Sequence, residues 1–230
     1  MRVSVASNGA EANDGSYGSV ISANGRFVVF WSMASNLVPG DTNREADIFV
    51  RDLHTGQISL ANVSSEGTQA NKGSVMDSFT ITSSGRFVAF TSEARNLVVG
   101  DTNWENDVFV HDRETGVTER VSVASDGTQG NGPSSAVGIS ANGRYVVFGS
   151  SADNLVAGDT NGCSDVFVHD RQTGQTNRIS VASDGTQGND RSYGGSVSAD
   201  GHFIAFSSRA DNLVPGDTNY AGDVFVYERR

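Results

Sequence analysis

One eleven-residue segment occurs four times in this chain, and it constrains the fold more than any other feature. Each copy starts with the letters GDTN, has an Asp four residues after the Asn, and ends in an apolar run: GDTNREADIFV at 40, GDTNWENDVFV at 100, GDTNGCSDVFV at 158 and GDTNYAGDVFV at 216. Repeats of about 60 residues are typical of propellers and related arrays, in which each unit buries its faces against its neighbours.

Within each repeat the apolar residues follow the period of β-strands. A segment such as SYGSVIS is followed by Asn24-Gly25 and then by RFVVFWS, and equivalent turns end at Gly85, Gly143 and Gly201. Such residue pairs favour tight hairpins because they tolerate positive φ. After the long GDTN loop, DIFVRDL and QISLANVS are expected to form a third and a fourth strand.

These patterns predict an all-β fold, a β-propeller of four four-stranded blades, as one domain over residues 1–230. The repeats span about 10–67, 68–127, 128–185 and 186–230, the last completed by residues 1–9. Residues 2–7 read RVSVAS and match the fourth strands at 120 and 178, so they are predicted to complete the last blade and close the ring. Half of an eight-bladed ring formed by two chains, or a fragment of a longer propeller, are open alternatives.

The third repeat resembles the TolB-type, WD-like propeller repeats of bacterial proteins. The resemblance is carried by residues 140–187, which read SANGRYVVFGSSADNLVAGDTNGCSDVFVHDRQTGQTNRISVASDGTQ. The resemblance covers nearly the whole chain. It implies an exported protein that is extracellular, periplasmic or at the cell surface. Those families commonly carry six or more blades, whereas this chain has four.

The loop before each third strand carries the pattern D-x-N-x-x-x-D. Oxygen-bearing side chains at such spacing, with a main-chain carbonyl between them, surround calcium in known loops. The pattern predicts up to one calcium ion per blade, with these ligands: Asp41, Asn43, Asp47, Asp101, Asn103, Asp107, Asp159, Asn161, Asp165, Asp217, Asn219 and Asp223. The alternative is that Asp and Asn form hydrogen-bonded turns without an ion.

Net charge, cysteine content and hydropathy exclude several classes of partner, cross-link and membrane segment. The formal net charge of -11 would repel nucleic acid phosphates and anionic lipids, so neither nucleic acid nor membrane is an expected partner. The single cysteine, Cys163, excludes an intramolecular disulfide. No apolar run reaches the length of a membrane-spanning helix, and the N-terminus as given lacks the apolar core of a signal peptide.

The loops between blades carry amide and aromatic side chains suited to polar ligands. The candidate ligand-binding residues are Gln69, Gln129, Gln187, Tyr17 and Tyr193. A protein or a carbohydrate would fit such groups. The alternative is that the Asn and Gly residues of these loops only cap turns.

No catalytic residues are predicted. His111 and His169 share their repeat position with Arg51 and Tyr227, which indicates a solvated or rim position, and Cys163 has no identifiable base. The sequence therefore predicts a non-enzymatic, calcium-binding propeller that acts as a binding or scaffolding module, either a monomer or a ring-closing homodimer. A lectin-like propeller and a hydrolase or lyase with a site at the propeller mouth are the alternatives.

Overall fold

The computed structural model describes residues 1–229, apart from the side chains of residues 136 and 137, and all of its regular structure is β-strand. No helix in this described part is long and apolar enough to cross a membrane. The chain divides into two compact units, one of Met1–Trp104 with Phe109–Arg120 and one of Glu105–Val108 with Val121–Arg230. The single domain expected from the sequence stays a prediction, and each unit is described by itself.

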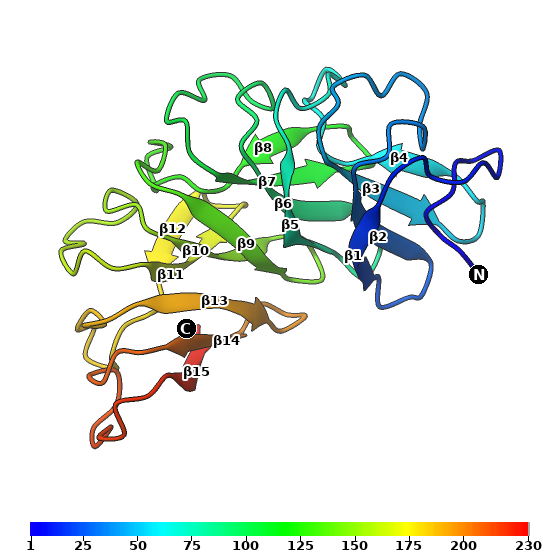
Figure 1. Cartoon of the computed structure of the whole chain (residues 1–230). Helices are drawn as coiled ribbons and strands as arrows, with labels where there is room; N and C mark the ends of the chain where they lie inside the picture. Colours follow the sequence, from blue (N-terminus) through cyan, green and yellow to red (C-terminus); the bar gives the residue numbers. More distant parts are fainter. Residues whose placement is uncertain (230) are drawn as a thin grey trace. The chain divides into compact units, whose positions relative to one another are not determined.

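The first unit carries two antiparallel sheets of four strands, ordered β1-β2-β3-β4 and β5-β6-β7-β8 (Figure 1). Only the start of β7 belongs to the other unit. The strands are β1 (Ser16–Ile21), β2 (Phe27–Ser32), β3 (Asp47–Asp52), β4 (Ile58–Leu60), β5 (Ser74–Ile81), β6 (Phe87–Ser92), β7 (Asp107–Asp112) and β8 (Thr118–Arg120).

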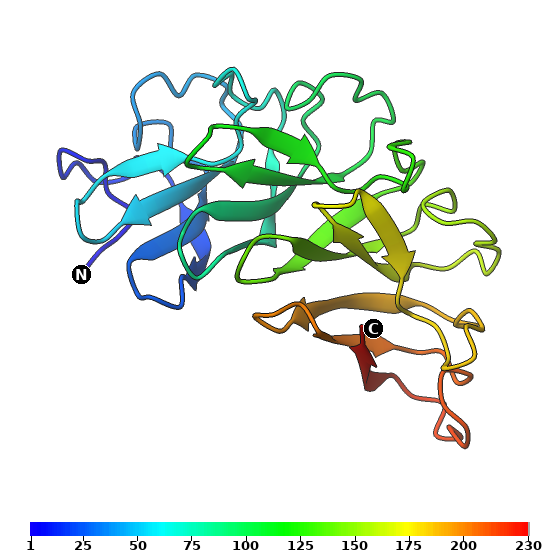
Figure 2. The ribbon, with the colours of Figure 1, turned by 180° about the vertical axis from the view of Figure 1, so that it is seen from behind.

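The second unit carries a four-stranded sheet, ordered β9-β10-β11-β12, and a three-stranded sheet, ordered β13-β14-β15. Figure 2 shows them from behind, the first in green to yellow and the second in orange to red. The strands are β9 (Ser134–Ile139), β10 (Tyr145–Ser150), β11 (Asp165–Asp170), β12 (Gln175–Arg178), β13 (Ser192–Val197), β14 (Phe203–Ser208) and β15 (Asp223–Glu228).

The middle strands of each sheet form the core. Nearly every residue of β2 and β3 is buried, because apolar side chains on both faces of the sheet are covered. Phe30 of β2 stacks on Phe49 of β3 at 5.7 Å between ring centroids, and Phe148 stacks on Phe167 in the same way at 5.8 Å. Each such ring contributes about 1.5–3 kcal/mol by its removal from water. This repeated core confirms the predicted all-β meanders.

An ion pair fastens the hairpin turn of three sheets to the end of the third strand. The guanidinium of Arg26 donates to both carboxylate oxygens of Asp52, at 3.1 and 2.7 Å. Arg86–Asp112 and Arg144–Asp170 repeat this two-bond contact. The hydrogen bonds from arginine lower the pKa of each of these carboxyls, that of Asp170 to about 2.

The turn glycine of the second repeat is required by close packing. Gly85 has φ +78°, and a Cβ there would lie 2.0 Å from the Phe27 ring. Any other residue at this position would be strained and would displace the ring.

The predicted closure by residues 2–7 is not present in the strand pairing of the described residues. The last sheet has three strands, and Val5 pairs instead with Glu11. Three later segments repeat that bridge, for example Val63 with Gln69, so residues 5–11 adopt the conformation of a loop between blades. The described residues therefore form three four-stranded sheets and one three-stranded sheet, and a closed ring of four blades stays a prediction.

Candidate functional site at the acidic loops

Turn chemistry orders the loops that carry the D-x-N-x-x-x-D pattern. In the first loop, Asn43 Oδ1 accepts the N–H of Glu45 at 3.1 Å, while Asn43 Nδ2 donates to both oxygens of Asp47 at 3.1 and 3.2 Å. Asn161 and Asn219 make the corresponding bonds in the third and fourth loops. These are Asx turns, in which the side chain hydrogen-bonds the backbone of its own loop.

The orientation of these Asn side chains bears on the predicted calcium sites. A calcium ligand must present an oxygen to the ion. The Asn43 oxygen is engaged by a backbone N–H, and its amide group faces a carboxylate, so Asn43 does not fit as a ligand in this conformation. Among the residues that the structure describes, no three His, Cys, Asp or Glu side chains are grouped closely enough to hold a metal. Calcium binding by the twelve predicted residues stays a prediction.

The second Asp of the pattern is a buried anchor. Asp47 is 1% exposed and accepts a bond from Asn62 Nδ2 at 2.5 Å, while Asn62 Oδ1 accepts the N–H of Ile48. In the third repeat, Ser180 takes the place of this Asn and donates to Asp165 at 2.6 Å. In the first three repeats, the anchor ties the start of the third strand to the loop that leads to the next sheet.

The glutamines predicted to bind a ligand donate hydrogen bonds to aspartates of the D-x-N-x-x-x-D pattern. Gln69 Nε2 donates to Asp41 Oδ1 at 3.1 Å, and Gln69 Oε1 accepts the N–H of Thr42 at 3.0 Å. Gln187 Nε2 donates to Asp159 at 2.8 Å, and Gln129 Nε2 donates to Asp107 at 3.1 Å. Both ends of the Gln69 amide are therefore occupied by its own loop, and a ligand role for the glutamines stays a prediction.

The two tyrosines proposed as aromatic surface are accessible. Tyr17 is 54% exposed and Tyr193 is 44% exposed. The Tyr17 ring contacts Trp31 at 6.0 Å between centroids in a tilted arrangement. Exposure alone does not identify a ligand, so their binding role also stays a prediction.

An arginine neutralises the acidic loop in the second and third repeats. Arg178, the last residue of β12, lies 3.2 Å from Asp159 and 3.3 Å from Asp165. Arg120, the last residue of β8, lies 3.5 Å from Asp101. Both arginine side chains are about nine-tenths buried, so these pairs are only weakly screened by solvent.

The prediction of a rim position for His111 and His169 is wrong. Each is only 6% exposed, and each Nδ1 lies 2.8 Å from a Thr hydroxyl, Thr118 or Thr176. The Thr118 hydroxyl donates to the Val63 carbonyl, so the imidazole N–H is the donor to the Thr oxygen. Burial lowers the pKa of His111. His111 lies in β7, where the loop that carries Val63 covers it. The residue types found at this repeat position did not reveal that contact.

The loop tips carry functional candidates that the sequence analysis missed. The residue after GDTN has positive φ in every repeat: Arg44 at 59°, Trp104 at 64°, Gly162 at 64° and Tyr220 at 54°. Trp104 is 75% exposed and Tyr220 is 93% exposed. The Arg95 guanidinium lies 3.3 Å from the centre of the Trp104 ring. The signal was available in the sequence, because this position follows the constant letters GDTN and carries Arg, Trp, Gly or Tyr in the four repeats.

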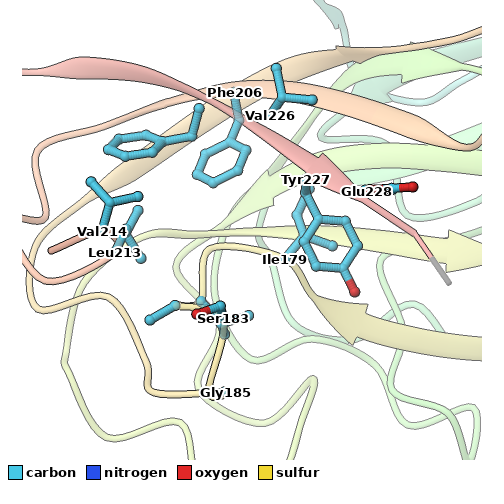
Figure 3. Close-up of a pocket in the computed structure, with 12 residues that line it drawn as sticks. Ile179, Ser183, Gly185, Phe206, Leu213, Val214, Val226, Tyr227 and Glu228 are labelled. Carbon is cyan, nitrogen blue, oxygen red and sulfur yellow. The ribbon is translucent and has the colours of Figure 1, made fainter.

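A pocket of about 500 Å³ lies beside β15 in the second unit, and Figure 3 shows Phe206, Leu213, Ile179 and Tyr227 around it. In the other three sheets a fourth strand pairs with the third strand on the corresponding side. The pocket therefore follows from the shorter last sheet. Its lining holds no pair of acid and base suited to catalysis.

Comparison with known proteins identifies the fold. No family model and no curated protein matches the sequence. Among solved structures, one assigned as TolB from Agrobacterium tumefaciens superposes with a TM-score of 0.57 at 13% identity, over 94% of this chain and 58% of that one. A prolyl endopeptidase (TM-score 0.55, 12% identity, 94% and 28% covered) and the tricorn protease (0.54, 16%, 93% and 21%) are also similar. The chain thus spans less than two thirds of each of these proteins, and it has the blade architecture of TolB-type propellers.

Proposed function

We propose that this chain is a non-enzymatic binding module that contacts a protein partner through the tips of its acidic loops. The observation that carries the proposal is the exposure of Trp104 and Tyr220 at equivalent tip positions. Large aromatic side chains in water forgo the stability that burial would give, and they are enriched where proteins bind partners.

The backbone at the tips supports this assignment. Positive φ is unfavourable for a bulky residue and costs on the order of 1 kcal/mol. Gly162 occupies the same conformation in the third repeat, where it is the residue that suits the backbone best. Trp104 and Tyr220 are held there against both backbone strain and solvent exposure, which favours a role in binding over a role in stability.

Differences between the tips favour a protein over a carbohydrate. The tips present Arg44, Trp104, Gly162 and Tyr220, and so each repeat offers a different contact. Arg, Trp and Tyr are the types that dominate binding energy at protein interfaces. A lectin-like propeller would need a similar aromatic platform in every blade, and an enzyme would need one asymmetric catalytic cluster.

The test uses two libraries and matched variants. Peptides selected by phage display on the wild-type chain would be measured for affinity against Trp104→Ala and Tyr220→Ala, with Phe203→Ala as the exposed aromatic control. We expect the tip variants to weaken binding about tenfold or more and the control to leave it unchanged. Binding to a glycan array that persists in both tip variants, with no peptide selected, would overturn the proposal.

Several finer features belong to this proposal and rest on the sequence. They are ring closure by residues 2–7, a monomer or ring-closing homodimer, and an exported, periplasmic or cell-surface location. The match of RVSVAS to the fourth strands at 120 and 178 supports the first of them.

A further inference from the structure

The outer edge of β15 lacks the strand that covers the same edge in the other three sheets. In the third sheet, the N–H of Ile179 donates to the carbonyl of Val166 at 2.8 Å, and the first and second sheets repeat this bond. Val224 occupies the position of Val166 in β15, and it is 75% exposed, whereas Val166 is buried. An open strand edge with exposed apolar side chains is suited to pairing with another extended segment.

Residues at the end of the fourth strand also hold the acidic loop in the second and third repeats. In the third repeat, the Arg178 guanidinium contacts Asp159 and Asp165, and Ser180 Oγ donates to Asp165 at 2.6 Å. The second repeat has the equivalent contacts, Arg120 with Asp101 and Ser122 with Asp107. An arginine, an apolar residue and a serine in sequence therefore serve both the strand edge and the loop.

The fourth acidic loop has the carboxylates of these repeats without the arginine or the serine. Asp217 and Asp223 are partly exposed, and in the described part of the chain neither forms an ion pair with a Lys, Arg or His. Asp223 accepts the turn bond from Asn219 Nδ2 at 3.1 Å. A hollow of about 480 Å³ is lined by Asp217, Asp223 and Val224, at the place that corresponds to the arginine and the fourth strand of the third repeat.

Residues 2–7 carry the missing groups in the required order. They read RVSVAS, the same six letters as residues 120–125. The first three, Arg2, Val3 and Ser4, are the counterparts of the arginine, the apolar donor and the serine of the third repeat. One short segment of this sequence therefore has the backbone N–H, the guanidinium group and the hydroxyl that β15 and its acidic loop lack.

Val3 is packed on one side only. Its counterpart Ile179 is fully buried in a cluster with side chains of β11, in its own sheet, and of β14, in the next sheet. Val3 is half-buried against the cluster of the first sheet that includes Phe30 of β2, the counterpart of Phe206. The strand that corresponds to β11 is β15, whose Val226 is 67% exposed (Figure 3). Val3 thus has the apolar contact of one sheet and lacks that of the other.

We propose that the open edge of β15 binds residues 2–4 of a second copy of this chain, and that two copies exchange these segments. In the bound register the N–H of Val3 donates to the carbonyl of Val224. Arg2 balances the charge of Asp217 and Asp223, which favours this segment over an uncharged strand. Each copy has one open edge and one unpaired segment, so a reciprocal pair of copies leaves neither exposed.

The segment of the same chain is held away from β15 by contacts within the first unit. The Val5 carbonyl accepts a bond from Arg51 Nη1 at 2.9 Å, and Arg2 pairs with Glu11. The Arg2–Glu11 pair is exposed and contributes little, so its exchange for the acidic loop of a partner costs little. This inference deepens the ring closure included in the proposed function, because it names the chain that supplies the strand, and it does not depend on the loop tips.

The first test traps the exchanged strand with a disulfide. Val3→Cys and Val224→Cys are combined with Cys163→Ser, because directly opposite residues of paired strands have Cα atoms about 5.5 Å apart, within reach of a disulfide. We expect mild oxidation of the full chain to yield a species of twice the chain mass on a non-reducing gel, and neither cysteine alone to yield it. A disulfide within one chain would assign the edge to the chain's own segment, and no disulfide in the folded double variant would mean that the edge is not paired. Either result would overturn the proposal.

The second test reverses the charge of the exchanged segment. Sedimentation of the full chain over a range of concentrations measures the dissociation constant of the dimer. Arg2→Glu is expected to weaken the dimer about tenfold or more, because it places a like charge beside the fourth acidic loop. Combining it with Asp217→Arg should restore part of the affinity.

The matched control reverses an arginine at a loop tip. Arg44→Glu changes an exposed charge outside the interface and should leave the dimer unchanged, as should Trp104→Ala, so this proposal and the proposed function of the tips fail separately. Circular dichroism confirms that each variant is folded. A wild type that is monomeric at every concentration, or equal weakening by Arg2→Glu and Arg44→Glu, would contradict the assignment of the strand to a second copy.

Discussion

The first and third acidic loops share a turn but balance their charge differently. Each loop has an Asn that accepts a backbone N–H and donates to the second Asp, as Asn43 and Asn161 show. The third loop then places Arg178 between two carboxylates, whereas the first has Leu60. The comparison teaches that the repeated letters specify the turn, while a residue outside them decides whether its carboxylates have an arginine partner.

The largest expected effect comes from Arg178→Leu. Because the variant leaves Asp159 and Asp165 buried without a cation, the free energy of unfolding should fall by about 3–5 kcal/mol in the presence of chelator. Urea denaturation monitored by tryptophan fluorescence measures this decrease. A decrease below about 1 kcal/mol would show that the ion pairs contribute little, as exposed pairs do.

The reverse exchange should have a smaller effect of opposite sign. Leu60→Arg is expected to raise the free energy of unfolding by about 1 kcal/mol in chelator, because the new guanidinium group offsets the charge of Asp41 and Asp47 and some apolar contact is lost. The same urea experiment on wild type and variant checks this. If the variant were destabilised, the two loops would differ in packing and not in charge.

Low pH should weaken the arginine–aspartate pair of each of the first three repeats in the same way, whereas the acidic loops differ in their charge balance. The folded-state pKa values of Asp52, Asp112 and Asp170 are lowered by their arginines, so these pairs contribute their full stability above about pH 4 and lose it as the pH falls toward 2. Melting temperature measured across this range should therefore decrease. Asp170→Asn should flatten the decrease, and an unchanged slope in that variant would argue against the pair as its source.

The smallest effect is expected at the loop tips. Arg44→Gly and Tyr220→Gly should raise the free energy of unfolding by about 0.5–1 kcal/mol, because glycine relieves the positive-φ conformation. Thr218→Gly, beside one of these tips and without positive φ, should lower it. Equal destabilisation by all three substitutions, measured by urea denaturation, would show that the tips carry no strain.

Much of the fold was predictable because it depends on local patterns. Glycine turns, apolar alternation and the repeat length indicated four-stranded meanders, and the sheets and the TolB-like structures confirm them. The closure by residues 2–7 depended on contacts between distant segments, and the strand pairing does not show it.

The candidate site was predictable only in part. The pattern located the acidic loops, but the direction of the Asn43 amide and the reach of Arg178 from another strand depend on tertiary structure. The environment of His111 was mispredicted for the same reason, since a covering loop far along the chain buries it.

The most direct test of the account is the stability of the two exchange variants, Arg178→Leu and Leu60→Arg. Urea denaturation of the wild type and of each variant, monitored by tryptophan fluorescence, measures their free energies of unfolding. The account predicts that Arg178→Leu is less stable than the wild type and that Leu60→Arg is more stable. Destabilisation of the same size by both substitutions would contradict the conclusion that the residue at this position sets the charge balance of the loop.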